Sequence, residues 1–243
     1  MPQKRGIDVK KLIALLLLCL LGSSACASVR DSAGPAAETR KETVLTAQDV
    51  PGPEIIQKPI AFSNVRRRLM REYARIHYGE EMETIVPRAV VVHWTASDSM
   101  EGVYRFFYPE EQPKLKNGTL NVASHFLVGK DGTIWQLTPE TALDRHAIGL
   151  NWCAIGIENV GGADGKEDLT EAQLEANIRL IRFLHQKYPT ITWVLGHYQQ
   201  DEAMHTELWK ENIKGYYHGK IDPGPIFMQG LRDGLAGEGV KFF

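Results

Sequence analysis

The sequence has few cysteines, no excess of positive charge, no internal repeat and no long hydrophobic run beyond its amino-terminal end. Three cysteines in 243 residues allow at most one disulfide, which excludes a small disulfide-stabilised fold. A formal net charge of −2 gives no basis for general nucleic-acid binding. The remaining composition, with 43% hydrophobic and 24% charged residues, is typical of one globular domain with appendages.

Residues 1–25 are predicted to be a signal peptide. A basic start precedes ten apolar residues, Leu12 to Leu21, which are too few to span a bilayer as a helix and suit the core of a signal peptide. Cys26 then follows small residues, as the lipid-modified cysteine of a bacterial lipoprotein does. The alternative is ordinary cleavage at the A-x-A sequence around Cys26, which would give a secreted protein. The chain is expected to be exported, and a lipid on Cys26 would anchor it to a membrane of the bacterial envelope, in the periplasm or at the outer membrane.

Residues 26–60 are predicted to form a flexible tether, because Pro, Ala, Glu, Thr and Ser dominate there with little periodicity. The folded domain is then expected over residues 61–243. Within that domain Cys153 has no partner if Cys26 carries lipid. Its place beside Trp152 and before the run AIGI favours a buried core position over a nucleophilic role.

The domain is predicted to begin with an amphipathic helix that has its N-cap at Ser63 and ends at Gly79. Apolar residues recur at helical spacing from Val65 to Ile76. The five arginines of this segment are interpreted as a solvated face, with attraction to anionic wall polymer or lipid as the alternative. They are Arg66, Arg67, Arg68, Arg71 and Arg75.

Strand and helix patterns alternate through the rest of the domain. The continuous apolar runs RAVVVH, AIGIENV and TWVLGH predict buried strands, and ASHFLVGKDGTIWQL predicts a hairpin turned at residues 130–132. A capping box at Thr170 and Gln173 begins a helix that ends near Tyr188. The sequence therefore predicts an α/β fold in which helices pack on a mixed central β-sheet within a single catalytic domain.

Two histidines and one aspartate lie where these patterns end. His93 and His197 each terminate an apolar run, and Asp222 precedes the stiff sequence Pro-Gly-Pro. Two imidazoles and a carboxylate form the ligand set of an open catalytic zinc site. No HExxH motif ties the histidines together, so on spacing alone each residue keeps an ordinary alternative: a structural histidine or an Asx-turn aspartate.

The order of five segments strengthens this interpretation. VVHWTAS, SHFLVGKDGTIWQL, RHAIGLNWCAIGIENVG, GHY and KIDPGP follow one another within residues 87–228. In this order the chain resembles the zinc-dependent N-acetylmuramoyl-L-alanine amidases of the type 2 family, which are similar in fold to peptidoglycan recognition proteins and amidase-type phage lysozymes. The resemblance implies Zn²⁺ as the cofactor and His93, His197 and Asp222 as its protein ligands, with water in the fourth position.

The resemblance also implies roles for other residues. Glu158 matches the family's catalytic glutamate, which takes a proton from water and delivers it to the leaving amine. Lys220 matches the lysine that stabilises the oxyanion of the tetrahedral intermediate. His125 and His146 lie in matching segments and are candidates for substrate binding or for hydrogen bonds behind the site, with a purely structural role as the alternative.

The connection over residues 198–219 is longer than is usual between the second histidine and the lysine of this family. Its aromatic residues Trp209, Tyr216 and Tyr217 are interpreted as a helical lid or as a packed surface insertion. The expected function is zinc-dependent hydrolysis of the amide between N-acetylmuramic acid and L-alanine in peptidoglycan or muropeptides. The alternative is a non-catalytic peptidoglycan-binding module with the same fold, although such a binder would not need all five site residues.

Overall fold

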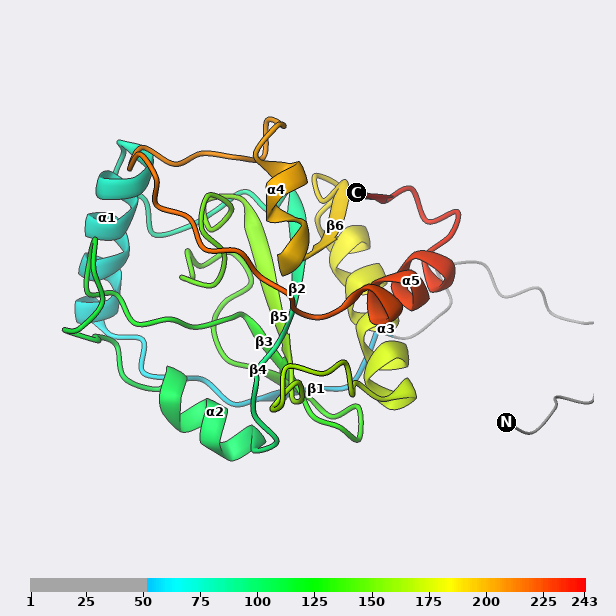
Figure 1. Cartoon of the computed structure of the whole chain (residues 1–243). Helices are drawn as coiled ribbons and strands as arrows, with labels where there is room; N and C mark the ends of the chain where they lie inside the picture. The colour runs from blue at the N-terminus through cyan, green and yellow to red at the C-terminus, as the bar shows by residue number, and fades with distance from the viewer. Residues whose placement is uncertain (1–51) are drawn as a thin grey trace, which may run out of the picture. The chain divides into compact units, whose positions relative to one another are not determined.

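A seven-stranded mixed sheet forms the centre of the computed structural model, which describes residues 52–243 (Figure 1). The strand order is β1-β4-β3-β5-β2-β6-β7. Neighbouring strands are parallel except β3 and β4, which pair antiparallel. The strands are β1 (Ile55–Gln57), β2 (Ala89–Trp94), β3 (Phe126–Val128), β4 (Ile134–Gln136), β5 (Ala154–Asn159), β6 (Trp193–Gly196) and β7 (Lys241–Phe242). This topology confirms the predicted mixed sheet and the predicted hairpin.

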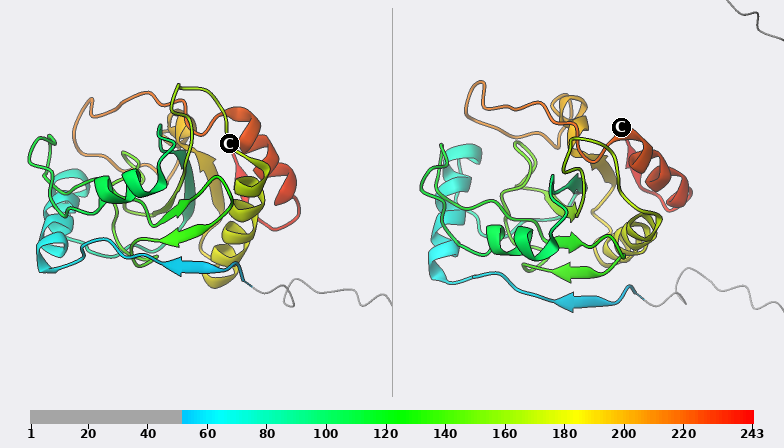
Figure 2. Two further views of the ribbon diagram at one scale, coloured as in Figure 1. Left: turned by 90° about the horizontal axis from the view of Figure 1, so that it is seen from below. Right: turned by 60° about the horizontal axis from the view of Figure 1, so that its bottom comes forward.

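Within residues 52–243, five α-helices and one short 3-10 helix surround the sheet. They are α1 (Asn64–Tyr78), α2 (Met100–Phe107), α3 (Glu171–Lys187), η3 (His197–Gln199), α4 (Gln200–Ala203) and α5 (Pro225–Gly234). Helices α3 and α5 lie side by side, as both views in Figure 2 show. The capping box at Thr170 and Gln173 is present at the start of α3, as predicted.

The apolar run of β2 is explained by burial on both of its faces. Val90 and Val92 belong to the largest core cluster, to which α1, α3 and α5 also contribute. Val91 points the other way and packs in a second cluster with Leu150 and Leu208. Because successive side chains of a strand alternate between faces, a strand covered on both sides must be apolar at every position.

Helix α1 has the predicted caps, and its predicted solvated basic face is present at Arg67, Arg68 and Arg75, which are exposed, but not at Arg66. Ser63 accepts a hydrogen bond from the Val65 amide, and Gly79 closes the helix in the left-handed conformation with φ 78°. Arg66, however, is only 1% exposed. Its guanidinium donates to the carbonyl oxygens of residues 61, 107 and 109 at 2.7 to 3.2 Å. The prediction of a solvated face was therefore wrong for Arg66, because three backbone carbonyls that are distant in sequence offset the cost of burying its charge.

The folded domain begins before residue 61. Strand β1 pairs in parallel with β4, and the pairing continues through hydrogen bonds from the amides of Lys58 and Ile60 to residues 136 and 137. Ile60 is buried. The predicted tether over residues 26–60 is thus corrected at its carboxyl end. A three-residue edge strand is held mainly by backbone hydrogen bonds, so its sequence carries almost no periodic signal.

Cys153 is buried and free, as predicted, and burial raises the pKa of its thiol to about 12. The predicted signal peptide, the predicted lipid-modified Cys26 and most of the tether lie outside the described residues. Between residues 52 and 243, no helix has both the length and the apolar character required to cross a membrane.

The insertion, residues 198–219, is packed against the domain. Only η3 and α4 at its start are helical, which excludes a largely helical lid. Trp209 lies so close to Gly149 that a Cβ atom there would approach its ring to 2.5 Å. The indole of Trp152 donates to the Leu208 carbonyl at 3.0 Å. The insertion therefore forms part of the wall of the domain.

Candidate active site

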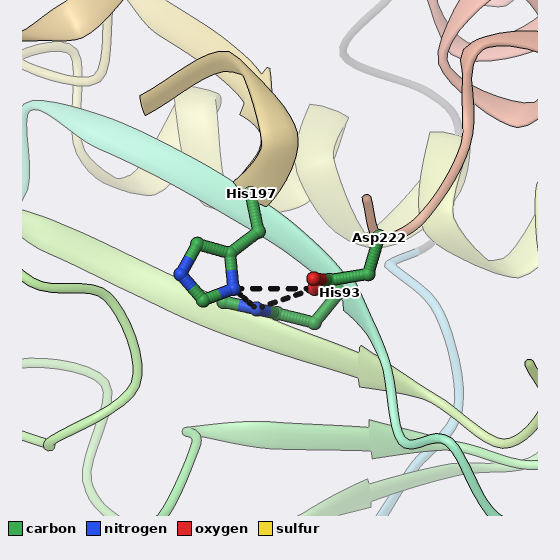
Figure 3. A group of neighbouring side chains, drawn as sticks. All are labelled: His93, His197 and Asp222. Atoms are coloured by element: carbon green, nitrogen blue, oxygen red, sulfur yellow. Dashed lines mark hydrogen bonds and ion pairs between the residues drawn. The ribbon is translucent and has the colours of Figure 1, made fainter. Parts of the chain in front are cut away.

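Two adjacent strands and one loop bring the predicted metal ligands together. His93 lies near the carboxyl end of β2, and His197 directly follows β6, whose Gly196 pairs with Val92. Parallel neighbours end at the same edge of a sheet, so the two imidazoles meet there. Asp222 reaches them from the loop before α5, and its carbonyl accepts a hydrogen bond from the Tyr198 amide at 2.9 Å. The three side chains point toward one another (Figure 3).

The ligand atoms of these side chains converge closely. The two Nδ1 atoms of His93 and His197 lie 2.9 Å apart, and each lies 3.2 Å from Oδ2 of Asp222. All three residues are buried. Tetrahedral zinc with bonds of about 2.0–2.1 Å separates neighbouring ligand atoms by about 3.3 Å, close to the spacing seen here.

The chemistry of the three atoms also fits a cation. With no proton on either Nδ1 atom, the two imidazole nitrogens and the carboxylate oxygen are all acceptors, and they lie within 4.8 Å of one another. Without a positive charge or a proton between them, three buried acceptors at this distance repel one another. The residues present therefore suit a zinc-type ion with nitrogen and oxygen ligands.

The charges of the site reflect this close packing. Burial and the neighbouring His93 lower the pKa of His197 to about 4, although Asp222 opposes the shift. For Asp222, burial works to raise the pKa, but the adjoining imidazoles of His197 and His93 outweigh it and hold the pKa well below its usual range. Neutral imidazole beside ionised carboxylate is the state that binds a metal ion.

Glu158 and Lys220 lie in the same cleft. Glu158 on β5 pairs in register with His93 on β2, and its Oε2 atom is buried without a hydrogen-bond partner. Burial, with repulsion from Asp222, raises the pKa of Glu158 well above its usual range, and Lys220 partly offsets this. A carboxylate with a raised pKa is suited to taking and returning a proton near neutral pH. Lys220 is exposed in the cleft wall, two residues before Asp222.

The cleft has a volume of about 490 Å³. It contains all five predicted metal-ligand and catalytic residues together with His146. Two further lining residues, Arg145 and Phe106, were not predicted from the sequence. Phe106 is 57% exposed although α2 buries its neighbour Phe107. An aromatic residue beside the apolar stripe of a short amphipathic helix was the available signal for it.

His125 and His146 have different positions. His125 lies in the core, where its Nε2 atom donates to the Ala142 carbonyl at 2.9 Å and its Nδ1 atom accepts from the Gly156 amide at 3.0 Å. The structure does not bring His125 to the cleft, because both ring nitrogens are used by the backbone. His146 does line the cleft, and its Nδ1 atom lies 3.1 Å from Nε2 of His93. Burial, with repulsion from His93 and His125, lowers the pKa of His146 well below its usual range.

Comparisons with known proteins relate this chain to one enzyme family. A family model described as N-acetylmuramoyl-L-alanine amidase matches residues 83–225. The endolysin of Escherichia phage T7 is 31% identical over 123 residues, which cover 47% of this chain and 76% of that protein. The endolysin of Enterobacteria phage T3 is 32% identical over 108 residues, with 41% and 68% coverage. Among solved structures, N-acetylmuramoyl-L-alanine amidase LysC from Clostridium intestinale URNW aligns with 78% of this chain and 99% of its own, at a TM-score of 0.48 and 23% identity.

Proposed function

Since the chain belongs to the N-acetylmuramoyl-L-alanine amidase family, we propose that it cleaves the amide between N-acetylmuramic acid and L-alanine with zinc held by His93, His197 and Asp222. The observation that carries this proposal is the convergence of three buried acceptor atoms within 4.8 Å in a cleft that also contains Glu158 and Lys220. The phage relatives are named endolysins, which agrees with peptidoglycan as the substrate.

Zinc, when bound, supplies Lewis-acid polarisation of the amide carbonyl and eases the ionisation of water. Glu158 takes the proton from the attacking water, because its carboxylate is desolvated and its pKa is raised. The same carboxyl then delivers that proton to the leaving amine nitrogen of L-alanine. The ammonium group of Lys220 donates a hydrogen bond to the developing oxyanion.

The alternative, a peptidoglycan-binding module without turnover, fits this geometry less well. A binding surface needs contacts with glycan or peptide, but it does not need a buried carboxylate without a partner. Desolvation of that kind is unfavourable for the folded protein and serves a group that must exchange a proton.

The role assignments predict that ligands and catalytic groups respond differently to mutation. Asp222→Ala removes one of three protein ligands and should lose both zinc and activity. Glu158→Gln and Lys220→Ala should keep zinc and lose turnover. For Lys220→Ala we expect a fall of about a hundred-fold to a thousand-fold in kcat, as for the loss of an oxyanion donor.

Elemental analysis beside mass analysis of the products from one purified muropeptide, with and without chelator, checks these assignments. Activity should stop with the chelator and return with zinc. Full turnover by a verified metal-free preparation would refute zinc dependence. A zinc-free Lys220→Ala or a fully active Glu158→Gln would show that the roles are assigned wrongly.

We also propose that the protein acts on the cell wall from a lipid anchor at Cys26. The support is the sequence before that residue, a basic start followed by a short apolar core and small residues. The wild-type protein should partition into a detergent phase and Cys26→Ser into the aqueous phase. Equal partition of the two proteins would favour simple secretion.

A further inference from the structure

A row of hydrogen bonds leads from the metal ligands into the core. Nε2 of His93 lies 3.1 Å from Nδ1 of His146, and Nε2 of His146 lies 3.1 Å from the carbonyl oxygen of Ala154. On the other side of His93, Nδ1 faces His197 and Asp222. Every ring nitrogen of His93 and His146 therefore has an identified polar partner: the metal-ligand group, the other histidine or the Ala154 carbonyl oxygen.

The carbonyl at the end of this row fixes every proton along it. The Ala154 oxygen can only accept, so Nε2 of His146 must carry a proton. In a neutral ring, Nδ1 of His146 is then an acceptor, and Nε2 of His93 must donate to it. This leaves Nδ1 of His93 without a proton and with its lone pair directed at the metal-ligand group.

We propose that His146 is a positioning residue, which selects the Nε2–H tautomer of His93 and holds its ring so that Nδ1 is presented to the metal. The proposal rests on the proposed zinc site but concerns the resting arrangement of the protein before any substrate is bound. It assigns His146 to the support of a ligand and not to substrate binding. Orienting partners of this kind affect metal affinity because they fix the ligand's direction and increase its basicity.

The packing around His146 supports this assignment. Its backbone amide and that of Ala147 both donate to Oδ1 of Asn151, at 2.9 and 2.7 Å. A Cβ atom at Gly156 would lie 2.8 Å from the His146 ring, so β5 has a glycine where the ring passes. His125 packs edge-on against the same ring at 5.8 Å between centroids. The imidazole is enclosed on several sides and is held in one orientation.

Three variants separate positioning from ordinary packing. His146→Leu removes the acceptor and retains much of the volume. His146→Asn restores an acceptor oxygen near the position of Nδ1. His125→Leu is the matched control, since it removes a neighbouring buried histidine whose ring packs against that of His146 and whose nitrogens bind the backbone instead of His93.

Two readouts are needed, both on protein without substrate. In the metal-free form, nitrogen-detected NMR of the imidazoles should show His93 as the Nε2–H tautomer in the wild type and a mixture in His146→Leu. Zinc affinity, measured by competition with a chromogenic chelator, should fall about 10-fold to 100-fold in His146→Leu. We expect most of the affinity to return in His146→Asn and to be retained in the folded fraction of His125→Leu. Urea unfolding in chelator corrects each variant for lost stability.

A His146→Leu protein with wild-type zinc affinity would overturn the proposal, as would a wild-type His93 that carries its proton on Nδ1. If His146→Leu does not fold, the wild-type tautomer and the affinity of His146→Asn decide the question. A wild type that shows the expected tautomer but binds no zinc would refute the proposed zinc site and leave the positioning of His93 established.

Discussion

This protein buries two groups that each combine histidine with a carboxylate. The two groups satisfy their polar atoms in different ways. One is the metal-ligand group of His93, His197 and Asp222. The other is a pair formed by His77, on α1, and Glu211, in the insertion. Each combines imidazole with carboxylate away from solvent, and the side chains of His77 and Glu211 are only 0% and 3% exposed.

The two groups differ in the hydrogen-bond partners of their imidazole nitrogens. Nδ1 of His77 lies 2.8 and 3.0 Å from the two carboxylate oxygens of Glu211, and its Nε2 lies 2.9 Å from the Asn117 carbonyl oxygen. Both ring nitrogens face acceptors, so a proton shared with Glu211 completes every hydrogen bond. In the metal-ligand group the two Nδ1 atoms and Oδ2 of Asp222 converge, and a cation among them would satisfy all three. The His77–Glu211 pair is therefore satisfied by atoms of the protein alone, whereas the metal-ligand group suits a bound cation.

The insertion, residues 198–219, contacts both helix α1 and the cleft wall. The Asn212 amide donates to the His77 carbonyl at 2.8 Å, and the Tyr216 ring lies 4.9 Å from that of His77. The Tyr216 hydroxyl accepts a hydrogen bond from Arg145, which lines the cleft. The insertion thus connects the end of α1, at His77, with the cleft wall, at Arg145.

His77→Leu is expected to have the largest effect, and this effect should be on stability and not on zinc binding. This change removes the imidazole from the buried Glu211 carboxylate and leaves it the Ile213 amide, so it should lower the free energy of unfolding by about 3–5 kcal/mol. Zinc affinity of the folded fraction should stay at the wild-type value. Urea unfolding of the metal-free protein measures the first quantity and chelator competition the second.

Two further changes serve as controls. Glu211→Gln should cost far less, because the amide can donate to a neutral His77 while its oxygen still accepts from the Ile213 amide. Lys210→Met removes a neighbouring but exposed pair with Glu80 and should cost at most about 1 kcal/mol. The comparison fails if His77→Leu is as mild as Lys210→Met, or if it releases zinc.

A smaller effect is expected from acid on the metal-free protein. The folded state holds the pKa of His197 at about 4, whereas the unfolded chain takes up this proton near the ordinary value of 6.5. Between these values the unfolded state binds more protons, so stability should fall as the pH falls through this window. Unfolding in chelator at a series of pH values measures the slope. His197→Asn should flatten it, and His77→Leu should leave this contribution in place. An unchanged slope in His197→Asn would contradict the assignment.

The parts that the sequence could predict are those with a local cause. Continuous apolar runs identified β2, β5 and β6, and because parallel neighbours end at one edge, His93 and His197 could be expected to meet. The helix caps at Ser63, Gly79 and Thr170 could also be predicted, because the residue types at a helix end signal its cap.

The parts that could not be predicted depend on partners distant in the chain. The acceptors that bury Arg66 lie up to 43 residues away, and Glu211 lies 134 residues from His77. His125 was a substrate-binding candidate by sequence order, but the carbonyl and the amide that occupy its ring come from two other segments. Strand β1 was missed because its pairing with β4 leaves hardly any trace in the side-chain pattern.

The metal-ligand group is divided between the best-protected strand and a loop. His93 lies on β2, which is hydrogen-bonded on both sides, while Asp222 is carried by a segment held at the Tyr198 amide and, just beyond it, by Glu167, which accepts from the amides of Ile226 and Phe227. Local opening of a protein begins where few backbone bonds must break. Release of the loop would free the carboxylate while both imidazoles stay in register. Exchange of the proposed zinc ion would then need a fluctuation of this one loop, at a free-energy cost well below that of unfolding the sheet.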